Sequence, residues 1–236
     1  MVNDEDGLSI VLPVYNEESN IREVVEGVFS VIGKITDNFE IIAIDDGSND
    51  NSLVILRKIA LSYPLLRIIQ NSKNIGYGAA IRRGITAAQM DWFLFMDADG
   101  QFRIDSLKEF WKIRKSYDFI IGYRAHRSDG IYRRILGQVG NIFANFFMGS
   151  NIFIKDITCG FKLFKTEDLK NIPLISTGGV INFEVLSKLF KLHKVKFIQL
   201  PVKHYSRLKG VASGGNIRVI LVRVLEFIRI ILSNAC

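Results

Sequence analysis

Hydrophobic residues along the chain form two alternating kinds of pattern. Short continuous apolar runs, rich in β-branched or aromatic side chains, are typical of buried strands, whereas apolar residues spaced three and four apart are typical of helices. The runs predict strands over residues 8–14, 39–44, 65–69, 92–96, 119–121, 160–164 and 195–202. The helical spacing predicts helices over residues 18–32, 51–61, 78–88, 104–115, 131–148, 182–192 and 216–233.

The regular alternation of strand and helix up to about residue 125 predicts an α/β fold. Apolar strands joined by helices indicate a mostly parallel sheet that is covered by helices on both faces. The second half is less regular, and we expect it to complete the same domain. Ligands of such sheets bind beyond the carboxyl ends of the strands. Polar clusters follow three of these ends, at residues 13–17, 45–46 and 97–101.

The sharpest chemical feature is the sequence D-A-D-G-Q directly after the strand at 92–96. From a strand-like tip, Asp97 and Asp99 are expected to point the same way. With Gln101 they offer hard oxygen ligands for Mg²⁺ or Mn²⁺, which would bridge the protein to a diphosphate. The alternative is a solvated turn. The buried strand before it, and a second acidic pair at residues 45–46, favour the metal site.

Asp45 and Asp46 end the second predicted strand, where a carboxylate can accept hydrogen bonds from a ribose or a base. Helix capping by Ser48 or Asp50 is the alternative for the residues that follow. Downstream, G-Y-G-A-A at residues 76–80 lacks the third glycine of a dinucleotide fingerprint. We therefore expect Gly76 and its small neighbours to let a helix approach the nucleotide closely.

Composition narrows the possible partners. The 236 residues carry a net charge of +7, with 48% hydrophobic and 23% charged residues, which is ordinary for a globular protein that binds an anionic partner. No arginine-rich tract or aromatic signature supports nucleic acid as that partner. Two cysteines and an acidic start predict a reduced cytoplasmic compartment without a secretion signal. The longest uncharged stretch is too polar to span a membrane.

Four segments in this order resemble family 2 glycosyltransferases of the GT-A fold: S-I-V-L-P-V-Y-N-E-E, I-I-A-I-D-D-G-S-N-D-N-S, N-I-G-Y-G-A-A-I-R-R-G and M-D-A-D-G-Q. Four later segments are similar to the polyprenyl-phosphate glycosyltransferases, the group that contains dolichyl-phosphate mannose synthase: I-I-G-Y-R, Y-R-R-I-L-G-Q-V-G-N, D-I-T-C-G-F-K-L-F and P-V-K-H-Y-S-R-L-K-G-V-A-S. The resemblance covers about residues 8–215. It implies one GT-A domain over 1–215, with a nucleotide-sugar half (1–125) and an acceptor half (126–215), followed by an amphipathic helix over 216–236.

The resemblance implies metal-dependent transfer of a sugar, with inversion, from a nucleotide-diphosphate donor to a polyprenyl phosphate. The expected donor-site residues are Pro13, Tyr15, Glu17, Asp45, Asp46, Gly76, Asp97, His204, Arg207 and Ser213. The expected ligands of Mg²⁺ or Mn²⁺ are Asp97, Asp99 and Gln101. The acceptor phosphate would be bound by Arg124, Arg133 and Arg134, since guanidinium groups suit phosphate oxygens.

One position departs from the family pattern. Gly137 stands where lipid-phosphate members commonly have a serine that helps to bind the acceptor phosphate, and Arg134 could replace that serine. A phosphate acceptor is already largely ionised and needs no strong base, so the arginines must hold two anions together. A hydroxyl acceptor would need a base, for which Asp156 is the candidate; otherwise Asp156 orients its neighbours. The expected catalytic residues are Asp99, Arg124, Arg133 and Asp156.

The terminal helix combines four charges on one arc with a face of Ile, Leu, Val and Phe. Those charges argue against a membrane span and fit an interfacial helix that faces lipid head groups. Docking of this helix on the protein or on a partner subunit is the alternative. The aromatic helix at 131–148 poses the same choice. We expect peripheral association with the cytoplasmic face of a membrane through these two helices.

Two other functions remain open from the sequence. One is a soluble family 2 enzyme that glycosylates a hydroxyl group of a saccharide or protein, which Gly137 supports and the match around Arg124 and Arg133 opposes. The other is a non-catalytic module that binds a nucleotide sugar. The complete set of metal-ligand candidates argues against that module.

Overall fold

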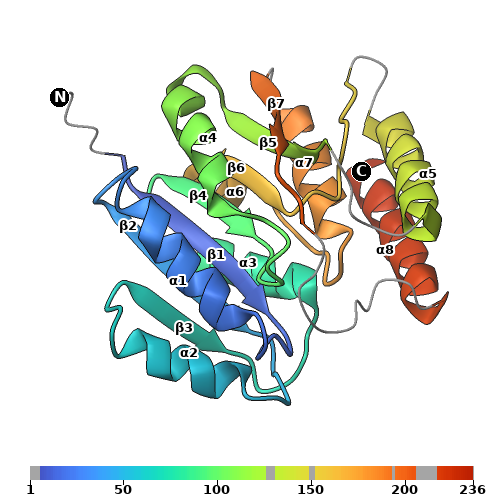
Figure 1. The fold of residues 1–236 in the computed structure, drawn as a ribbon. Helices are drawn as coiled ribbons and strands as arrows, with labels where there is room; N and C mark the ends of the chain where they lie inside the picture. The colour runs from blue at the N-terminus through green and yellow to red at the C-terminus, as the bar shows by residue number, and fades with distance from the viewer. Residues whose placement is uncertain (1–5, 126–130, 149–151, 193–194, 206–216, 236) are drawn as a thin grey trace.

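The computed structural model describes residues 6–125, 131–148, 152–192, 195–205 and 217–235 (Figure 1). Within them, seven strands form one sheet in the order β3-β2-β1-β4-β6-β5-β7. The strands are β1 (Leu8–Val14), β2 (Phe39–Asp45), β3 (Leu66–Gln70), β4 (Trp92–Met96), β5 (Phe119–Arg124), β6 (Phe161–Lys165) and β7 (Phe197–Val202). β6 runs antiparallel to its neighbours β4 and β5, and the other pairs are parallel.

Helices cover both faces of this sheet. They are α1 (Ile21–Ile32), α2 (Ser52–Ala60), α3 (Tyr77–Ala87), α4 (Leu107–Ile113), α5 (Ile131–Met148), α6 (Thr166–Asn171), α7 (Ile181–Leu192) and α8 (Ile217–Ala235). Short 3-10 turns, η1 (Ile104–Ser106) and η2 (Arg114–Ser116), flank α4. No helix in the described part of the chain is both long enough and apolar enough to cross a bilayer.

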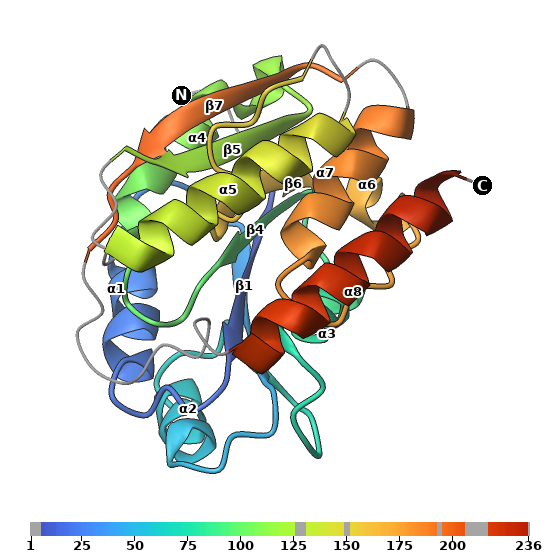
Figure 2. The ribbon, with the colours of Figure 1, turned by 90° about the vertical axis from the view of Figure 1, so that its right-hand side faces the viewer.

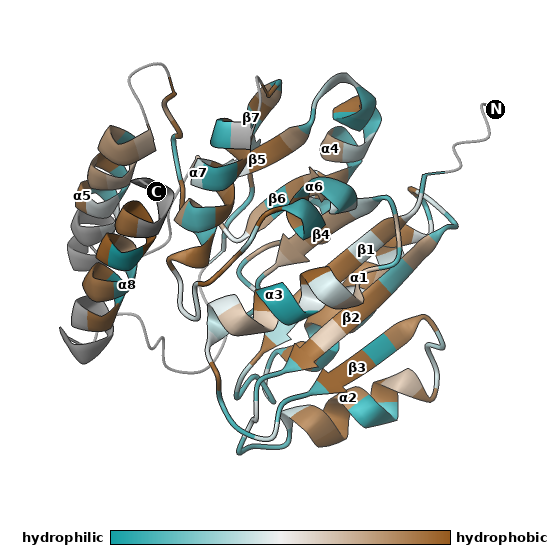
Figure 3. Ribbon diagram, turned by 180° about the vertical axis from the view of Figure 1, so that it is seen from behind, coloured by the Kyte–Doolittle hydropathy of each residue, from teal (hydrophilic) through white to brown (hydrophobic). Residues whose placement is uncertain are grey.

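Most residues of the central strands are hydrophobic (Figure 3), and the sheet separates two hydrophobic cores. Because successive side chains point to opposite faces, Leu12 packs with α1, α2 and α4, whereas Val11 packs with α3 and the later helices. α5 and α8 lie outside α7 on this second face (Figure 2). The Phe227 ring of α8 lies 4.5 Å from the Phe183 ring of α7 and 5.4 Å from the Phe143 ring of α5, measured between centroids.

The predicted α/β class with a mostly parallel sheet is confirmed. The strands at 8–14 and 92–96 and the helix at 131–148 have the predicted bounds, because each is a continuous pattern ended by turn residues. Two features were not predicted. α6, with the polar sequence T-E-D-L-K-N, has too few apolar positions to show a helical period. The hydrophobic pattern of β6 does not indicate that this strand runs antiparallel to its neighbours.

Candidate active site at the carboxyl edge of the sheet

β1, β2, β4 and β5 all end at one edge of the sheet, so the residues that follow them are brought together (Figure 1). β6 runs the other way and begins at this edge. Residues 156–160, which precede β6, therefore lie beside residues that follow β4 and β5. The reversed strand is what joins the second half of the chain to the acidic clusters of the first half.

Asp46 holds the loop before α3. Its carboxylate accepts hydrogen bonds from the Asn71 side chain (2.7 Å) and from the backbone amides of Ile75 (3.0 Å) and Gly76 (2.8 Å). Asp45, one residue earlier, is fully buried, and neither of its carboxylate oxygens has a hydrogen-bond partner among the described residues. The two acidic residues therefore have different surroundings, and contact of Asp45 with a nucleoside stays a prediction.

The segment after β1 interlocks with the one after β2. The Asn16 amide donates to the Ser48 hydroxyl (3.0 Å), and the Asn49 amide donates to the Asn16 side chain (2.8 Å). Asn16 has a φ of 56°, in the left-handed region that asparagine tolerates. The predicted pocket residues of this segment differ in exposure: Tyr15 is 42% exposed, Glu17 is buried and Pro13 is intermediate.

The glycines at the start of α3 approach protein backbone. A Cβ at Gly76 would clash with the Thr177 carbonyl, and one at Gly78 would lie 2.6 Å from the Gly178 carbonyl oxygen. The Thr177 carbonyl instead accepts the amide of Gly78 at 2.7 Å and that of Ala79 at 3.2 Å. The sequence explained these small residues by the approach of a nucleotide. In the structure they admit the loop before α7, which caps the first turn of α3, and the approach of a nucleotide stays a prediction.

Asp97 lies at the centre of this edge. Its Oδ1 accepts the Tyr77 hydroxyl at 2.7 Å, and its carboxylate covers Gly160, leaving no room for a Cβ there. Burial raises the pKa of the Asp97 carboxyl, and the negative charge of Asp99 raises it further, to about 7. The Tyr77 hydrogen bond and the cations Arg124 and Lys162 act in the opposite direction. The carboxylates of Asp97 and Asp99 therefore lie close enough to interact, and their negative charges favour the binding of a cation between them.

The loop that carries Asp99 is tied to the segment after β7. Asp99 Oδ1 accepts the Gln101 amide at 3.0 Å, and the Gln101 side chain donates to the Tyr205 carbonyl at 3.1 Å. His204 is buried, pairs with Phe102 through an isolated antiparallel bridge, and packs its ring 5.2 Å from the Phe102 ring. His204 therefore lies beside the acidic loop, and its contact with the donor stays a prediction. Arg207 and Ser213 lie outside the described residues.

The residues predicted to hold the metal fit that role chemically. Asp97 and Asp99 supply carboxylate oxygens whose mutual repulsion a divalent cation would relieve. In the described part of the chain, no group of three or more His, Cys, Asp and Glu side chains could hold a metal. An ion here would rest on two carboxylates with the Gln101 amide, and its other positions would be left for substrate phosphates, as Mg²⁺ usually requires.

Arg124 and Asp156 form a bidentate ion pair at the end of β5. Arg124 Nε donates to Asp156 Oδ2 at 2.7 Å, and its Nη2 donates to Asp156 Oδ1 at 2.9 Å and to the Thr158 hydroxyl at 2.8 Å. The side chains are 13% and 4% exposed, so water screens the pair weakly. Asp156 therefore orients Arg124 here. Arg133 and Arg134 lie on the first turn of α5, and their side chains are outside the described residues.

Lys162 is a fully buried lysine that interacts with the carboxylates of Asp156 and Asp97. The sequence did not predict a role for it. Its ammonium donates to the Asn182 side chain (2.6 Å) and to the Cys159 carbonyl, and lies 5.1 Å from the Phe95 ring centroid. Burial lowers the pKa of Lys162 to about 8, while Asp156 and Asp97 act to raise it. The signal that could have identified it is a single lysine within the apolar run of a strand, G-F-K-L-F.

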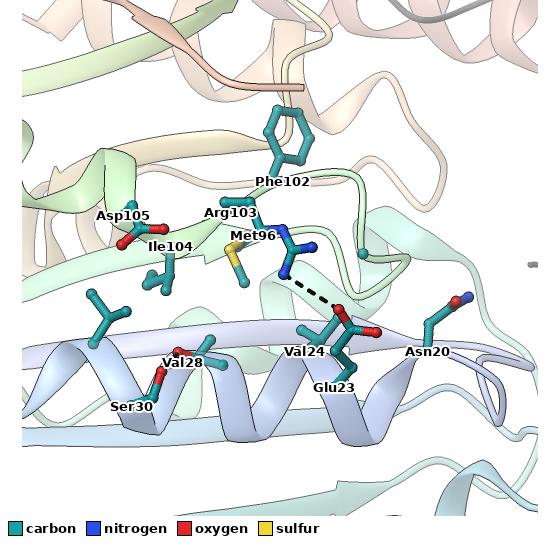
Figure 4. Close-up of a pocket in the computed structure, with 13 residues that line it drawn as sticks. Asn20, Glu23, Val24, Val28, Ser30, Met96, Phe102, Arg103, Ile104 and Asp105 are labelled. Carbon is teal, nitrogen blue, oxygen red and sulfur yellow. Dashed lines mark hydrogen bonds and ion pairs between the residues drawn. The ribbon is translucent and has the colours of Figure 1, made fainter. Parts of the chain in front are cut away.

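A separate pocket lies between α1 and residues 100–105, on the opposite side of the acidic loop (Figure 4). Its volume is about 110 Å³, well below the ~300–1,000 Å³ typical of ligand sites. Arg103 and Glu23 face each other across it at 3.3 Å, and both side chains are about half exposed. Met96 points into this pocket, so the neighbouring Asp97 points away from it. The pocket is therefore not part of the candidate active site.

This mixed sheet, with paired carboxylates after β4, is the arrangement of a GT-A glycosyltransferase. The model of glycosyl transferase family 2 matches residues 9–190, and the chain belongs to that family.

Curated relatives carry the names of polyprenyl-phosphate glycosyltransferases. Dodecaprenyl-phosphate galacturonate synthase of Rhizobium johnstonii is 29% identical over 232 residues, which are 94% of this chain and 67% of that protein. Dolichyl-phosphate beta-glucosyltransferase of Saccharomyces cerevisiae is 31% identical over 227 residues, covering 85% of this chain and 67% of that protein. The chain thus spans about two thirds of the length of these relatives.

A solved structure shares the fold. Glucosyl-3-phosphoglycerate synthase from Mycobacterium tuberculosis, crystallised with Mn²⁺, UDP-glucose and phosphoglyceric acid, has a TM-score of 0.69 and 18% sequence identity. The match covers 98% of this chain and 80% of that chain. At this identity the likeness establishes the GT-A fold alone.

Proposed function

We propose that this glycosyltransferase moves a sugar, with inversion, from a nucleotide-diphosphate sugar to a polyprenyl phosphate. The observation that carries the proposal is the placement of the Asp97–Asp99 pair and the Arg124–Asp156 pair at one edge of the sheet. The acidic pair suits a metal-bound donor diphosphate, and the arginine suits an acceptor phosphate. The names of the curated relatives, which act on prenyl phosphates, support the same acceptor.

The donor half of the proposal rests on the strand ends of the first half of the chain. A divalent cation held by Asp97, Asp99 and Gln101 would neutralise charge on the departing nucleotide diphosphate. Asp46 holds the loop before α3 through two backbone amides, which keeps the Tyr77 hydroxyl placed against Asp97. The solved structure that shares this fold was crystallised with Mn²⁺ and UDP-glucose, which supports a metal and a nucleotide sugar as ligands.

The acceptor half of the proposal rests on Arg124. Asp156 accepts two of its N–H groups and the Thr158 hydroxyl accepts another, which fixes the plane of the guanidinium. A carboxylate engaged in this way is a poor general base, which favours an acceptor that is already ionised over a hydroxyl group. The task of Arg124 is then to bring an acceptor phosphate against the sugar despite the negative charge of the donor.

Access to a lipid acceptor would come through α5 and α8. Exposed apolar residues on these two helices include Ile142, Phe143, Phe146, Val222, Leu225, Ile228 and Leu232. Phe227 and Ile230 of α8 pack against the protein, so the helix both docks on the domain and presents an apolar face. Arg229 on the same helix is exposed, which suits anionic head groups, whereas Arg223 lies against Gly179 on the side that docks on the protein. We propose that this combined face binds a lipid surface.

The central experiment uses the purified protein with Mn²⁺ or Mg²⁺, a panel of UDP- and GDP-sugars, and a short polyprenyl phosphate. Mass spectrometry of the organic phase should show a glycosyl-phosphate lipid that disappears with EDTA. Arg124→Ala should abolish this product while donor hydrolysis persists. The control Arg22→Ala should change neither, because among the described residues Arg22 pairs only with Glu26, on the surface of α1. Metal-dependent release of UDP or GDP without a lipid product would reject the prenyl-phosphate acceptor.

Membrane binding is tested separately by sedimentation with vesicles of phosphatidylcholine and phosphatidylglycerol. Phe146→Ser and Leu225→Ser, whose parent residues are 80% and 68% exposed, should reduce the bound fraction. Leu61→Ser is the matched control, since Leu61 is 87% exposed but follows α2. Equal binding of all three variants and the parent protein would reject this face as the lipid-binding surface.

A further inference from the structure

α5 carries two buried asparagines on the side that faces the protein. Asn141 and Asn145 are each 8% exposed, whereas Ile142 and Phe146 on the same helix are 67% and 80% exposed. A buried amide is costly unless its donors and acceptor are all used. The sequence had shown these residues only as polar positions that argue against a membrane span. Their burial calls for a structural partner.

That partner is the backbone of residues 154–157. Asn141 donates to the carbonyls of Ile154 (2.9 Å) and Lys155 (3.1 Å), and its Oδ1 accepts the amide of Ile157 (2.8 Å). Asn145 Oδ1 accepts the amide of Ile154 (2.7 Å), and its amide group donates back to the Ile154 carbonyl (2.9 Å). The two side chains thus supply hydrogen bonds to a segment that belongs to neither a helix nor a strand.

Asp156 lies within the segment that the asparagines hold. The side chains of Ile154 and Ile157 are buried in the core, at 0% and 2% exposure. With the backbone fixed on both sides and these two side chains anchored, Asp156 has little freedom to move. Its carboxylate is what orients Arg124 through two hydrogen bonds. The asparagines of α5 therefore act on the Arg124 guanidinium through the backbone of residues 154–157 and the Asp156 carboxylate.

We propose that Asn141 and Asn145 are positioning residues for the acceptor site. They hold Asp156, and through Asp156 they hold Arg124, in a fixed position relative to the donor site. This proposal rests on the proposed function for the role of Arg124, but the hydrogen bonds that carry it do not. Apolar side chains of similar size would fill the same space without specifying the backbone geometry of the segment. The side-chain amides of the two asparagines do specify this backbone geometry, because their hydrogen bonds are directional and shielded from water.

The kinetic test compares Asn141→Leu with Asn141→Asp. The leucine removes all three hydrogen bonds, whereas aspartate keeps the acceptor for Ile157 and loses the two donors. We expect Asn141→Leu to raise the KM for prenyl phosphate roughly 10-fold, the effect of about one lost hydrogen bond, with little change in the KM for the nucleotide sugar. Asn141→Asp should raise this KM at least as much, because it turns a buried carboxylate oxygen toward the carbonyls of Ile154 and Lys155.

A double-mutant cycle shows whether the effect passes through Asp156. If it does, Asn141→Leu combined with Asp156→Asn should raise the acceptor KM little more than Asp156→Asn alone. Met148→Ala is the matched control, because Met148 is buried on the same helix and packs only in the core. It should lower the melting temperature without changing the acceptor KM. Additive effects in the cycle, or an equal KM change in Met148→Ala, would overturn the proposal.

Two measurements need no acceptor. In Asn141→Leu, the amides of Ile154 and Ile157 should exchange hydrogen faster than the loss of global stability explains, and phenylglyoxal should modify Arg124 faster. Met148→Ala should speed exchange only as far as its own loss of stability predicts, and should leave the modification rate of Arg124 unchanged. Unchanged rates in Asn141→Leu would overturn the proposal whatever the acceptor is. If the parent protein makes no glycosyl-phosphate lipid, the proposed function fails, and these two rates still decide whether the asparagines hold Asp156 and Arg124.

Discussion

The carboxylate of Asp97 lies directly over the α-carbon of Gly160, with no space for a side chain between them. Asp97 follows β4, and Gly160 precedes the antiparallel strand β6, so the two residues meet at the ends of adjacent strands. The residue preceding β6 thus sets the position of the carboxylate that we place at the metal.

Gly160→Ala should therefore displace Asp97 while leaving the fold intact. We expect kcat/KM for sugar transfer to fall roughly 100-fold, the scale of loss when a reacting group is misplaced by about 1 Å. Steady-state kinetics measure this change. Gly27→Ala is the control, since a Cβ at Gly27 would meet nothing within 4 Å. If transfer by Gly160→Ala equals that of the parent, the close contact is not needed for activity.

Removal of one carboxylate tests the metal site. Asp99→Asn should lower kcat/KM roughly 100-fold or more, because a cation that stabilises the leaving diphosphate contributes several kcal/mol to the transition state. It should also raise the Mn²⁺ concentration that gives half-maximal activity. Asp105→Asn changes an exposed carboxylate a few residues away and should alter neither quantity. A normal metal dependence in Asp99→Asn would remove Asp99 from the ligand set.

Gly78→Ala tests the contact between α3 and the loop before α7. The new Cβ would lie 2.6 Å from the Gly178 carbonyl oxygen and 2.9 Å from that of Ser176, so that backbone must move. We expect a loss of about 1–3 kcal/mol in the free energy of unfolding, as for other overpacked sites. Urea denaturation measures it. Gly140→Ala, which meets nothing within 4 Å on α5, should be neutral or stabilising. Equal stability of both variants would contradict the observed contact.

Glu184 predicts a pH-dependent contribution to stability. Burial raises the pKa of its carboxyl, but hydrogen bonds from Lys188 and from the Ser176 and Ile175 amides outweigh burial and hold the pKa below 4.5. A carboxyl with a lowered folded-state pKa stabilises the protein above its unfolded pKa and loses that effect as the pH falls. At pH 7 the parent should be more stable than Glu184→Gln by about 1.5–3 kcal/mol.

The difference between these two proteins should shrink below pH 4.5 as Glu184 becomes protonated. Denaturation at a series of pH values measures it, with Glu109→Gln as the control because Glu109 is exposed on α4. A difference that stays constant down to pH 3 would show that the carboxylate charge does not contribute.

Much of the first half of the protein followed from the sequence alone. Continuous apolar runs such as Leu8–Val14 and Trp92–Met96 can only be buried between two layers of helices, so their extent and the mostly parallel sheet were predictable. The carboxyl ends of parallel strands share one edge, so the sequence predicted that Asp46 and Asp97 lie at the same edge of the sheet. The family resemblance, confirmed by the match over residues 9–190, named the activity.

Tertiary structure alone decided the contacts between the two halves of the chain. The direction of β6 depends on how the chain returns to the sheet, and that direction puts Gly160 under Asp97 and Asp156 beside Arg124. The role of the glycines before and within α3 likewise depended on the loop before α7, which is about 100 residues away in the chain. Local patterns report which residues are buried; which distant residues they meet is set by packing.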